Sequence, residues 1–174
     1  MVPGLQSDGD YSPDQAAVTL AGVHLAQLNV GRLVDHSDSP TAAEFILALP
    51  AINLLGESSP GFVWRLKDDD GAGALGQRFP GHEDDERFIV NLTVWTDFES
   101  LRHFATRSGH AMYLRRRLEW FEKASEPTTV LWWVEQGHIP GLDEAADRLA
   151  QLRRNGPTPG AFDMKTTFPA HLDV

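Results

Sequence analysis

One histidine stands where it could do chemistry on a small molecule. His110 follows Ser108, a good helix cap, so we expect it at a helix N-terminus on the flank of the buried helix face. The helix dipole disfavours a protonated imidazole there, which suits a neutral base, a hydrogen-bond donor or a metal ligand. The alternative is that His110 only caps or packs the start of the helix.

Two arginines near this histidine are candidates for contacting a substrate. Arg117 follows His110 by seven residues, a spacing that returns to nearly the same side of an α-helix, and we predict it as a catalytic orienting residue. Arg115 and Arg116 diverge from it by about 100° per residue, so we expect solvent or a dimer partner around them. Arg107 either binds a substrate anion or pairs with an acidic side chain.

Two amides stand in the middle of segments that alternate like strands. Asn29 lies within Val23–Leu33, and Asn91 lies within Phe88–Trp95. A buried amide is costly unless it is hydrogen-bonded, so each amide either orients a ligand or belongs to a polar network in the core or a dimer interface. We predict Asn91 as a catalytic residue beside the histidine, and Asn29 as a substrate contact.

The five tryptophans could supply flat walls for a planar, apolar ligand. Adjacent Trp132 and Trp133 must point to opposite faces of a strand, so at most one of them lines a given cavity. The alternative for each tryptophan is an ordinary place in the hydrophobic core. The predicted walls are Trp64, Trp95, Trp120 and Trp133.

Several kinds of chemistry and partner find no signal in the sequence. Cysteine is absent, and the seven histidines show no paired metal-ligand spacing, so we expect neither thiolate chemistry nor a metal site. We also find no phosphate loop, dinucleotide fingerprint or nucleophile elbow. A net charge of −10 argues against nucleic acid and anionic membranes as partners. Without a secretory signal or a membrane-length apolar run, we expect a cytoplasmic protein.

The elements that must position these residues can be read from periodicity and stop signals. The predicted strands are Val23–Leu33, Phe62–Leu66, Phe88–Trp95 and Thr128–Glu135. The predicted helices begin at Pro40, after Asp97, at His110 and at Leu142; the last two end near Lys123 and Arg154. Pro50 should kink or split the first helix. The acidic, glycine-rich segment 68–86 should be a solvated loop.

The order of these elements predicts the architecture. Residues 1–20 form a flexible lead-in, and residues 21–174 form one domain. The order β-α-β-β-α-β is that of a ferredoxin-like α+β fold with an antiparallel sheet, here with an extra C-terminal helix and an extended tail. Two main helices cover only one face of such a sheet. We therefore expect a second copy to cover the other face, which gives a dimeric α/β barrel.

Seven segments of the chain resemble the DUF3291 family, a family of unknown function within the dimeric α/β barrels. The resemblance covers about residues 22–165, almost the whole domain. The segments that carry it are Val23–Arg32, Pro60–Leu66, Asn91–Trp95, Arg107–His110, Arg117–Phe121, Leu131–Val134 and Gly156–Phe162.

The resemblance implies a function only through the wider superfamily, since a fold does not fix a reaction. That superfamily includes monooxygenases of antibiotic biosynthesis, muconolactone-type isomerases and haem proteins. The implied function is a cofactor-independent enzyme, monooxygenase-like or isomerase/cyclase-like, acting on a small aromatic or polyketide-like molecule with His110 as acid–base or orienting group. One alternative is a haem-binding protein with His110 as axial ligand. Another is a non-catalytic homodimer that binds a small molecule.

Overall fold

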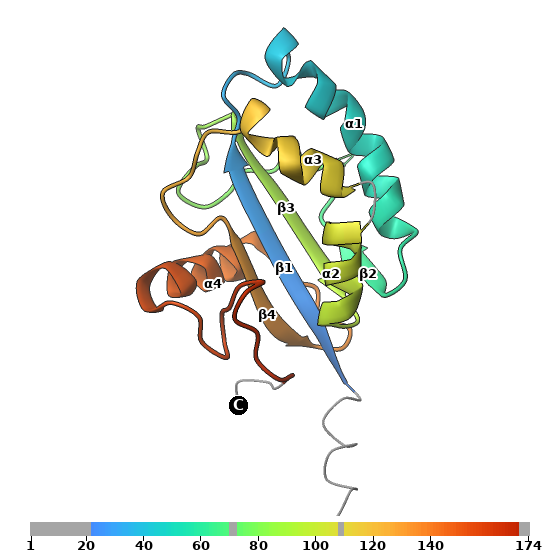
Figure 1. Cartoon of the computed structure of the whole chain (residues 1–174). Coiled ribbons are helices and arrows are strands. Elements are labelled where there is room, and N and C mark those ends of the chain that lie inside the picture. Colours follow the sequence, from blue (N-terminus) through green and yellow to red (C-terminus); the bar gives the residue numbers. More distant parts are fainter. Residues whose placement is uncertain (1–21, 70–72, 108–109, 171–174) are drawn as a thin grey trace, which may run out of the picture.

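A four-stranded antiparallel sheet with helices on both faces forms the body of the protein (Figure 1). The computed structural model describes residues 22–69, 73–107 and 110–170, without the side chains of His110 and Leu114. The strands are β1 (Val23–Arg32), β2 (Phe62–Arg65), β3 (Phe88–Trp95) and β4 (Thr129–Glu135). The helices are α1 (Pro40–Glu57), α2 (Phe98–Arg107), α3 (His110–Arg116) and α4 (Leu142–Asn155), with a short 3-10 turn, η2 (Arg117–Glu119).

The strand order confirms the predicted ferredoxin-like topology. The strands lie in the order β2-β3-β1-β4, with α1 connecting β1 to β2, and α2 and α3 connecting β3 to β4. All three strand pairings are antiparallel. The central pairs are regular, since Asn29 of β1 lies opposite Asn91 of β3 and Thr129 of β4. Because side chains alternate along a strand, this register decides which residues share each face.

Two helix predictions need correction. The helix α1 begins as expected, with Ser39 accepting a hydrogen bond from the Ala42 backbone N–H, but Pro50 does not split it, and it continues to Glu57. Pro50 is exposed, so the backbone bond it cannot donate is lost on a side where water is available. The helix from His110 ends at Arg116 instead of near Lys123. Its last part tightens into η2, where Leu118 is left 59% exposed.

One face of the sheet, here called the α4 face, is apolar along all three long strands and packs against α4. The strand residues buried there are Ala26, Leu28, Val30, Val90, Leu92, Val94, Val130, Trp132 and Val134. Ala145, Leu149 and Leu152 of α4 cover them together with Phe79. We expected this face to need a second copy to cover it. It does not, because the chain covers it with its own C-terminal helix α4. A homodimer remains a prediction.

The other face, here called the α2 face, carries two separate apolar clusters. The first joins strand residues, α2 and the C-terminal tail, and its buried members are Leu25, Trp95, Leu101, Phe104, Leu131 and Phe162. The second lies beneath α1 and α3, and it includes Leu33, Ala42, Trp120, Ile89, Tyr113 and Phe121. Figure 1 shows α1, α2 and α3 on this side of the sheet.

Two other predictions can be compared with the described residues. The segment 68–86 does not simply extend into solvent, because Phe79 within it is 5% exposed and belongs to the core of the α4 face. Phe162 pairs with Leu131 at a β-bridge, as a packed tail requires. In the part of the chain that the structure describes, no helix is long and apolar enough to cross a membrane.

Candidate functional site

A band of polar side chains crosses the α2 face between its two apolar clusters. The polar band consists of Gln27, Asn29, Asn91, Thr93 and Thr129. Gln27 lies opposite Thr93, and the next row on this face joins Asn29 to its two partners on the neighbouring strands. Polar groups in mid-sheet are costly unless they are paired, so the hydrogen bonds of the band decide what it can do.

A directed chain of hydrogen bonds runs through the buried half of the band. The Trp95 indole N–H donates to the Thr93 hydroxyl oxygen at 2.9 Å, and that hydroxyl donates to the Gln27 amide oxygen at 2.8 Å. An indole nitrogen can only donate, so the Thr93 hydroxyl accepts the first bond, and it uses its own hydrogen in the second. The amide oxygen of Gln27 is thereby occupied. Its NH₂ group has no hydrogen bond in the described part of the chain and remains available as a donor.

The outer half of the band offers an acceptor and a second amide. The Asn29 side-chain nitrogen donates to the Thr129 hydroxyl at 2.9 Å, which leaves the Asn29 amide oxygen as an acceptor. Asn91, directly opposite, is exposed, and its side chain has no hydrogen-bond partner among the described residues. The band thus presents a donor, an acceptor and an amide that can act as either.

Aromatic rings bound the band at both ends. At the end near α2, Trp95 is fully buried and half-buried Trp133 lies on the same face, where its indole N–H donates to the Phe168 carbonyl. At the other end, the Phe121 ring packs directly over Gly31. A Cβ at that position would come within 2.7 Å of the ring, so only glycine permits this contact without a shift. Trp132, which precedes Trp133 in β4, faces α4, so the two tryptophans point to opposite faces of the sheet as predicted.

The structure brings only some of the other predicted site residues toward the band. Arg107 is the last residue of α2 and is exposed. Arg117 is exposed at the start of η2. Trp64 packs with the cluster of the α4 face, on the opposite side of the sheet from Asn29 and Asn91. Of the predicted site residues, Asn29 and Asn91 therefore lie in the band, Trp95 and Trp133 lie beside it on the same face, and Trp64 does not.

His110 begins α3, as the sequence predicted, but its side chain lies outside the described residues. The placement of its neighbours is known. Tyr113 of α3 packs with Trp120 in the second cluster, and α3 also contacts α2. The role of His110 therefore stays a prediction.

Arg116 has a structural role that the sequence did not indicate. Its guanidinium binds Glu44 of α1 at 2.6 Å and Glu119 at 2.7 Å, and it lies 4.8 Å from the centre of the Trp120 ring. Its hydrogen bonds to Glu44 and Glu119 raise the pKa of Arg116 and lower the pKa of both carboxyl groups. Trp120 is 3% exposed in this arrangement, so it acts as a packing residue between α1 and η2.

Gln27, Thr93 and Thr129 were not among the predicted site residues. Alternation places Gln27 on the face of Asn29, and Thr93 on that of Asn91, but it does not say which strand lies beside which. The register between strands is what joins them into one band. Within the described residues, no three histidine, aspartate or glutamate side chains gather as a metal site would require.

The chain belongs to the DUF3291 family, described as a domain of unknown function, whose sequence profile matches residues 24–173. This confirms the resemblance found in the sequence. No curated protein matches the chain at a significant level of sequence similarity.

Two solved structures are similar to the chain. One is SnoaB, a cofactor-independent oxygenase from Streptomyces nogalater, which is 16% identical with a TM-score of 0.39 and covers 68% of this chain and 96% of its own. The other is a dabb family protein with a ferredoxin-like fold from Mesorhizobium loti. It is 14% identical with a TM-score of 0.37, and covers 69% of this chain and 98% of its own.

Proposed function

We propose that this protein binds and transforms a small planar molecule that carries carbonyl and hydroxyl oxygens, at the polar band of the α2 face. The observation that carries the proposal is the directed chain from Trp95 through Thr93 to Gln27, which presents an NH₂ donor between two aromatic clusters. A ligand carbonyl would accept from Gln27. A ligand hydroxyl would donate to Asn29, and Asn91 would hold a further oxygen.

The reaction we assign to the site is acid–base chemistry on the bound molecule, of the monooxygenase-like or isomerase/cyclase-like kind. His110 at the start of α3 is the group that would move a proton, since the dipole of the helix favours its neutral form. The amides of the band would orient the oxygens of the substrate, with no metal or redox cofactor taking part. The homodimer and the cytoplasmic location belong to the same proposal.

Binding is tested with a dihydroxyanthraquinone, a planar probe that carries both carbonyl and hydroxyl groups. Titration followed by tryptophan fluorescence should give saturable quenching. Asn91→Leu removes an exposed amide from the band and should weaken binding about tenfold, the effect of losing one good hydrogen bond to a ligand. Asn155→Leu, the same substitution at the exposed end of α4, is the matched control and should change nothing. Equal binding by both variants would contradict the proposal.

Catalysis needs a separate test, because a binding protein would pass the first one. The probe and related hydroxyquinones are incubated with the protein in air, and products are detected by mass spectrometry. His110→Ala should abolish product formation, whereas His103→Ala, at an exposed position of α2, should retain it. If no product forms while the probe still binds, the protein is a non-catalytic dimer that binds a small molecule, the alternative given by the sequence analysis.

Haem binding with His110 as axial ligand is a less favoured alternative. The polar band offers amides and hydroxyls where a porphyrin face needs apolar walls, so the described residues do not fit that group. Addition of haem to the purified protein should therefore produce no shifted Soret band. A band that appears with the native protein and disappears in His110→Ala would reverse this conclusion.

A further inference from the structure

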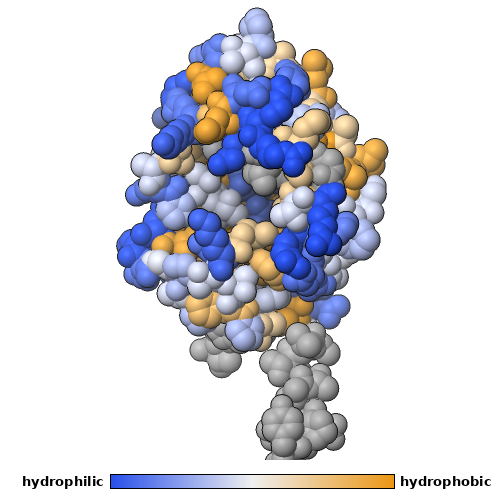
Figure 2. All heavy atoms as spheres, viewed as in Figure 1, coloured by the Kyte–Doolittle hydropathy of each residue, from blue (hydrophilic) through white to orange (hydrophobic). Residues whose placement is uncertain are grey.

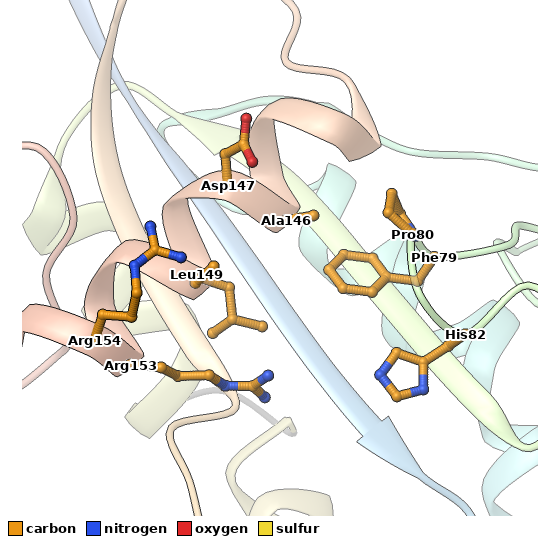
Figure 3. A pocket seen from close by; sticks show the side chains of 9 residues that line it. Phe79, Pro80, His82, Ala146, Asp147, Leu149, Arg153 and Arg154 are labelled. Atoms are coloured by element: carbon orange, nitrogen blue, oxygen red, sulfur yellow. The ribbon is translucent and has the colours of Figure 1, made fainter.

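A cavity lies on the α4 face, on the far side of the sheet from the polar band. It has a volume of about 400 Å³ and is bounded by α4 on one side and by the turn from Phe79 to His82 on the other (Figure 3). This size is within the range of cavities that hold small organic ligands. The groups that line it combine buried apolar surface with positive charge.

The turn that forms one wall has a conformation that its sequence explains. Pro80 and Gly81 occupy its two central positions, and the His82 backbone N–H donates to the Phe79 carbonyl at 2.9 Å. Gly81 has φ of 81°, which a type II turn requires at its third residue and glycine adopts without strain. The turn directs Phe79 toward α4, where its ring is 5% exposed beside the fully buried Leu149. The apolar wall of the cavity is therefore preformed.

His82 is held at the mouth of the cavity by stacking. Its imidazole lies parallel to the Phe88 ring, with ring centres 3.8 Å apart and an angle of 5° between the planes. Neither ring nitrogen has a hydrogen-bond partner in the described part of the chain. The stack orients the imidazole without using its polar atoms, and both nitrogens remain available to a ligand.

Arg153 faces His82 across the cavity. Its Nε donates to the Pro127 carbonyl at 3.0 Å and lies 3.5 Å from a Glu126 oxygen, which anchors the guanidinium near α4. Figure 3 shows its terminal nitrogens extended toward His82. These nitrogens have no hydrogen bond among the described residues. Arg154 lines the same cavity, but its side chain is directed away from His82.

We propose that this cavity is a second ligand site, for a small anion such as a carboxylate, sulfonate or phosphate attached to a flat apolar body. The anionic group would bind Arg153 and His82, and the flat body would lie against Phe79 and Leu149. The protein as a whole carries a net charge of −10, which opposes non-specific adsorption of anions. An anion that binds must therefore use a local site. The proposal is independent of the function assigned to the polar band.

The test uses two fluorescent probes with similar bodies. Anilinonaphthalene sulfonate carries the anion, and phenylnaphthylamine lacks it. The folded protein should bind the sulfonate at least about tenfold more tightly than the uncharged probe, the gain expected from a charge-assisted hydrogen bond. Circular dichroism of each sample confirms that the probe reports on folded protein.

Four variants locate the site and fix the sign of the electrostatic effect. Arg153→Gln should weaken sulfonate binding about tenfold. Ala150→Phe, which fills the cavity from α4, should weaken both probes. Asp147→Asn removes a carboxylate from the rim and should strengthen sulfonate binding. Arg102→Gln, which removes an exposed cation from α2, should have no effect.

Four results would overturn the proposal. One is equal affinity for the two probes. Another is unchanged sulfonate binding by Arg153→Gln together with Ala150→Phe, both folded by circular dichroism. The third is loss of probe binding in Asn91→Leu with retention in Ala150→Phe, which would place the probe at the polar band. Sedimentation showing that a second copy displaces the probe would also contradict it, because the cavity would then be part of an interface.

Discussion

The two faces of the sheet are built from the same three long strands but differ in how apolar they are. On the α4 face, every described position from Ala26 to Val30 that points toward α4 is apolar and buried, and the core is continuous. On the α2 face, the apolar rows stop and a polar band separates two clusters. The α4 face stabilises the fold, whereas the α2 face has less apolar burial and carries the polar groups at which we propose a ligand binds.

The helix α1 differs from α4 in that it exposes large hydrophobic side chains. Figure 2 shows hydrophobic residues along the edge where α1 lies, and Leu47 and Leu54 of that helix are 80% and 64% exposed. The helix has only Ala42 and Gly56 fully buried, so most of its apolar side chains contribute little to the core of this chain. The apolar packing on the α2 face therefore comes from the residues of its two clusters, and not from the whole length of α1.

The largest effect should come from comparing neighbouring residues on opposite faces. Leu28 is fully buried on the α4 face, and Leu28→Ala should lower the free energy of unfolding by about 2–5 kcal/mol through lost burial and the cavity it leaves. Asn29→Ala, one residue further on, loses one hydrogen bond to Thr129 and should cost about 1 kcal/mol. Urea denaturation measures both. Equal losses would show that the two faces do not differ in this way.

A smaller effect should follow from cutting the hydrogen-bond chain of the band. Thr93→Val keeps the shape of the side chain but removes the hydroxyl that joins Trp95 to Gln27, leaving a buried indole N–H unpaired. The expected loss is about 1–3 kcal/mol in the free energy of unfolding.

The matched control for that change is Thr106→Val. Its hydroxyl is exposed on α2 and donates to the Arg102 carbonyl, so water can replace the bond and stability should change by less than about 0.5 kcal/mol. If the two threonine variants lose the same stability, the chain through the band is not a buried network of the kind described.

The smallest effect concerns pH and the charged group beside the α2 face. Hydrogen bonds from Arg116 lower the pKa of Glu44 and of Glu119 below the ordinary value of 4.5. A lowered folded-state pKa adds stability above the ordinary value, and this stability is lost as pH falls through the lowered value. Acid unfolding of Arg116→Gln should therefore show a shallower loss of stability below pH 4.5 than the native chain.

Arg115→Gln provides the control, because Arg115 is the adjacent exposed cation and no ion pair of it is found within the described residues. Its acid unfolding curve should parallel that of the native chain. An unchanged slope in Arg116→Gln as well would mean that the ion pairs are fully screened by solvent, as many exposed pairs are.

The sequence predicted the framework because the framework depends on local patterns. Alternation located β3 at both ends, and Ser39 with Pro40 located the start of α1. The early end of α3 was not predictable in this way. It depends on the bridge between Leu33 and Phe121, a contact between segments far apart in the chain that pulls η2 onto the sheet.

The site was predictable only in part for the same reason. Asn29 and Asn91 were identified as costly amides, but the hydrogen bonds that join Asn29 to Thr129 and Thr93 to Gln27 form only through strand register. The coverage of the α4 face was missed because an amphipathic helix at the end of the chain does not show where it docks. Arg116 forms an ion pair with Glu44 of α1. The spacing within Arg115–Arg117 could not indicate this contact, because it depends on α1 lying beside α3.

The measurement that tests the central claim most directly uses the five tryptophans as reporters on both faces. Heteronuclear NMR of protein labelled at the indole nitrogens is recorded while a dihydroxyanthraquinone is added. Trp95, bonded into the polar band, and Trp133 should shift, whereas Trp132, bonded to Glu144 beneath α4, and Trp64 should not. Shifts confined to Trp132 and Trp64, or no shift at any indole under saturating probe, would contradict the account.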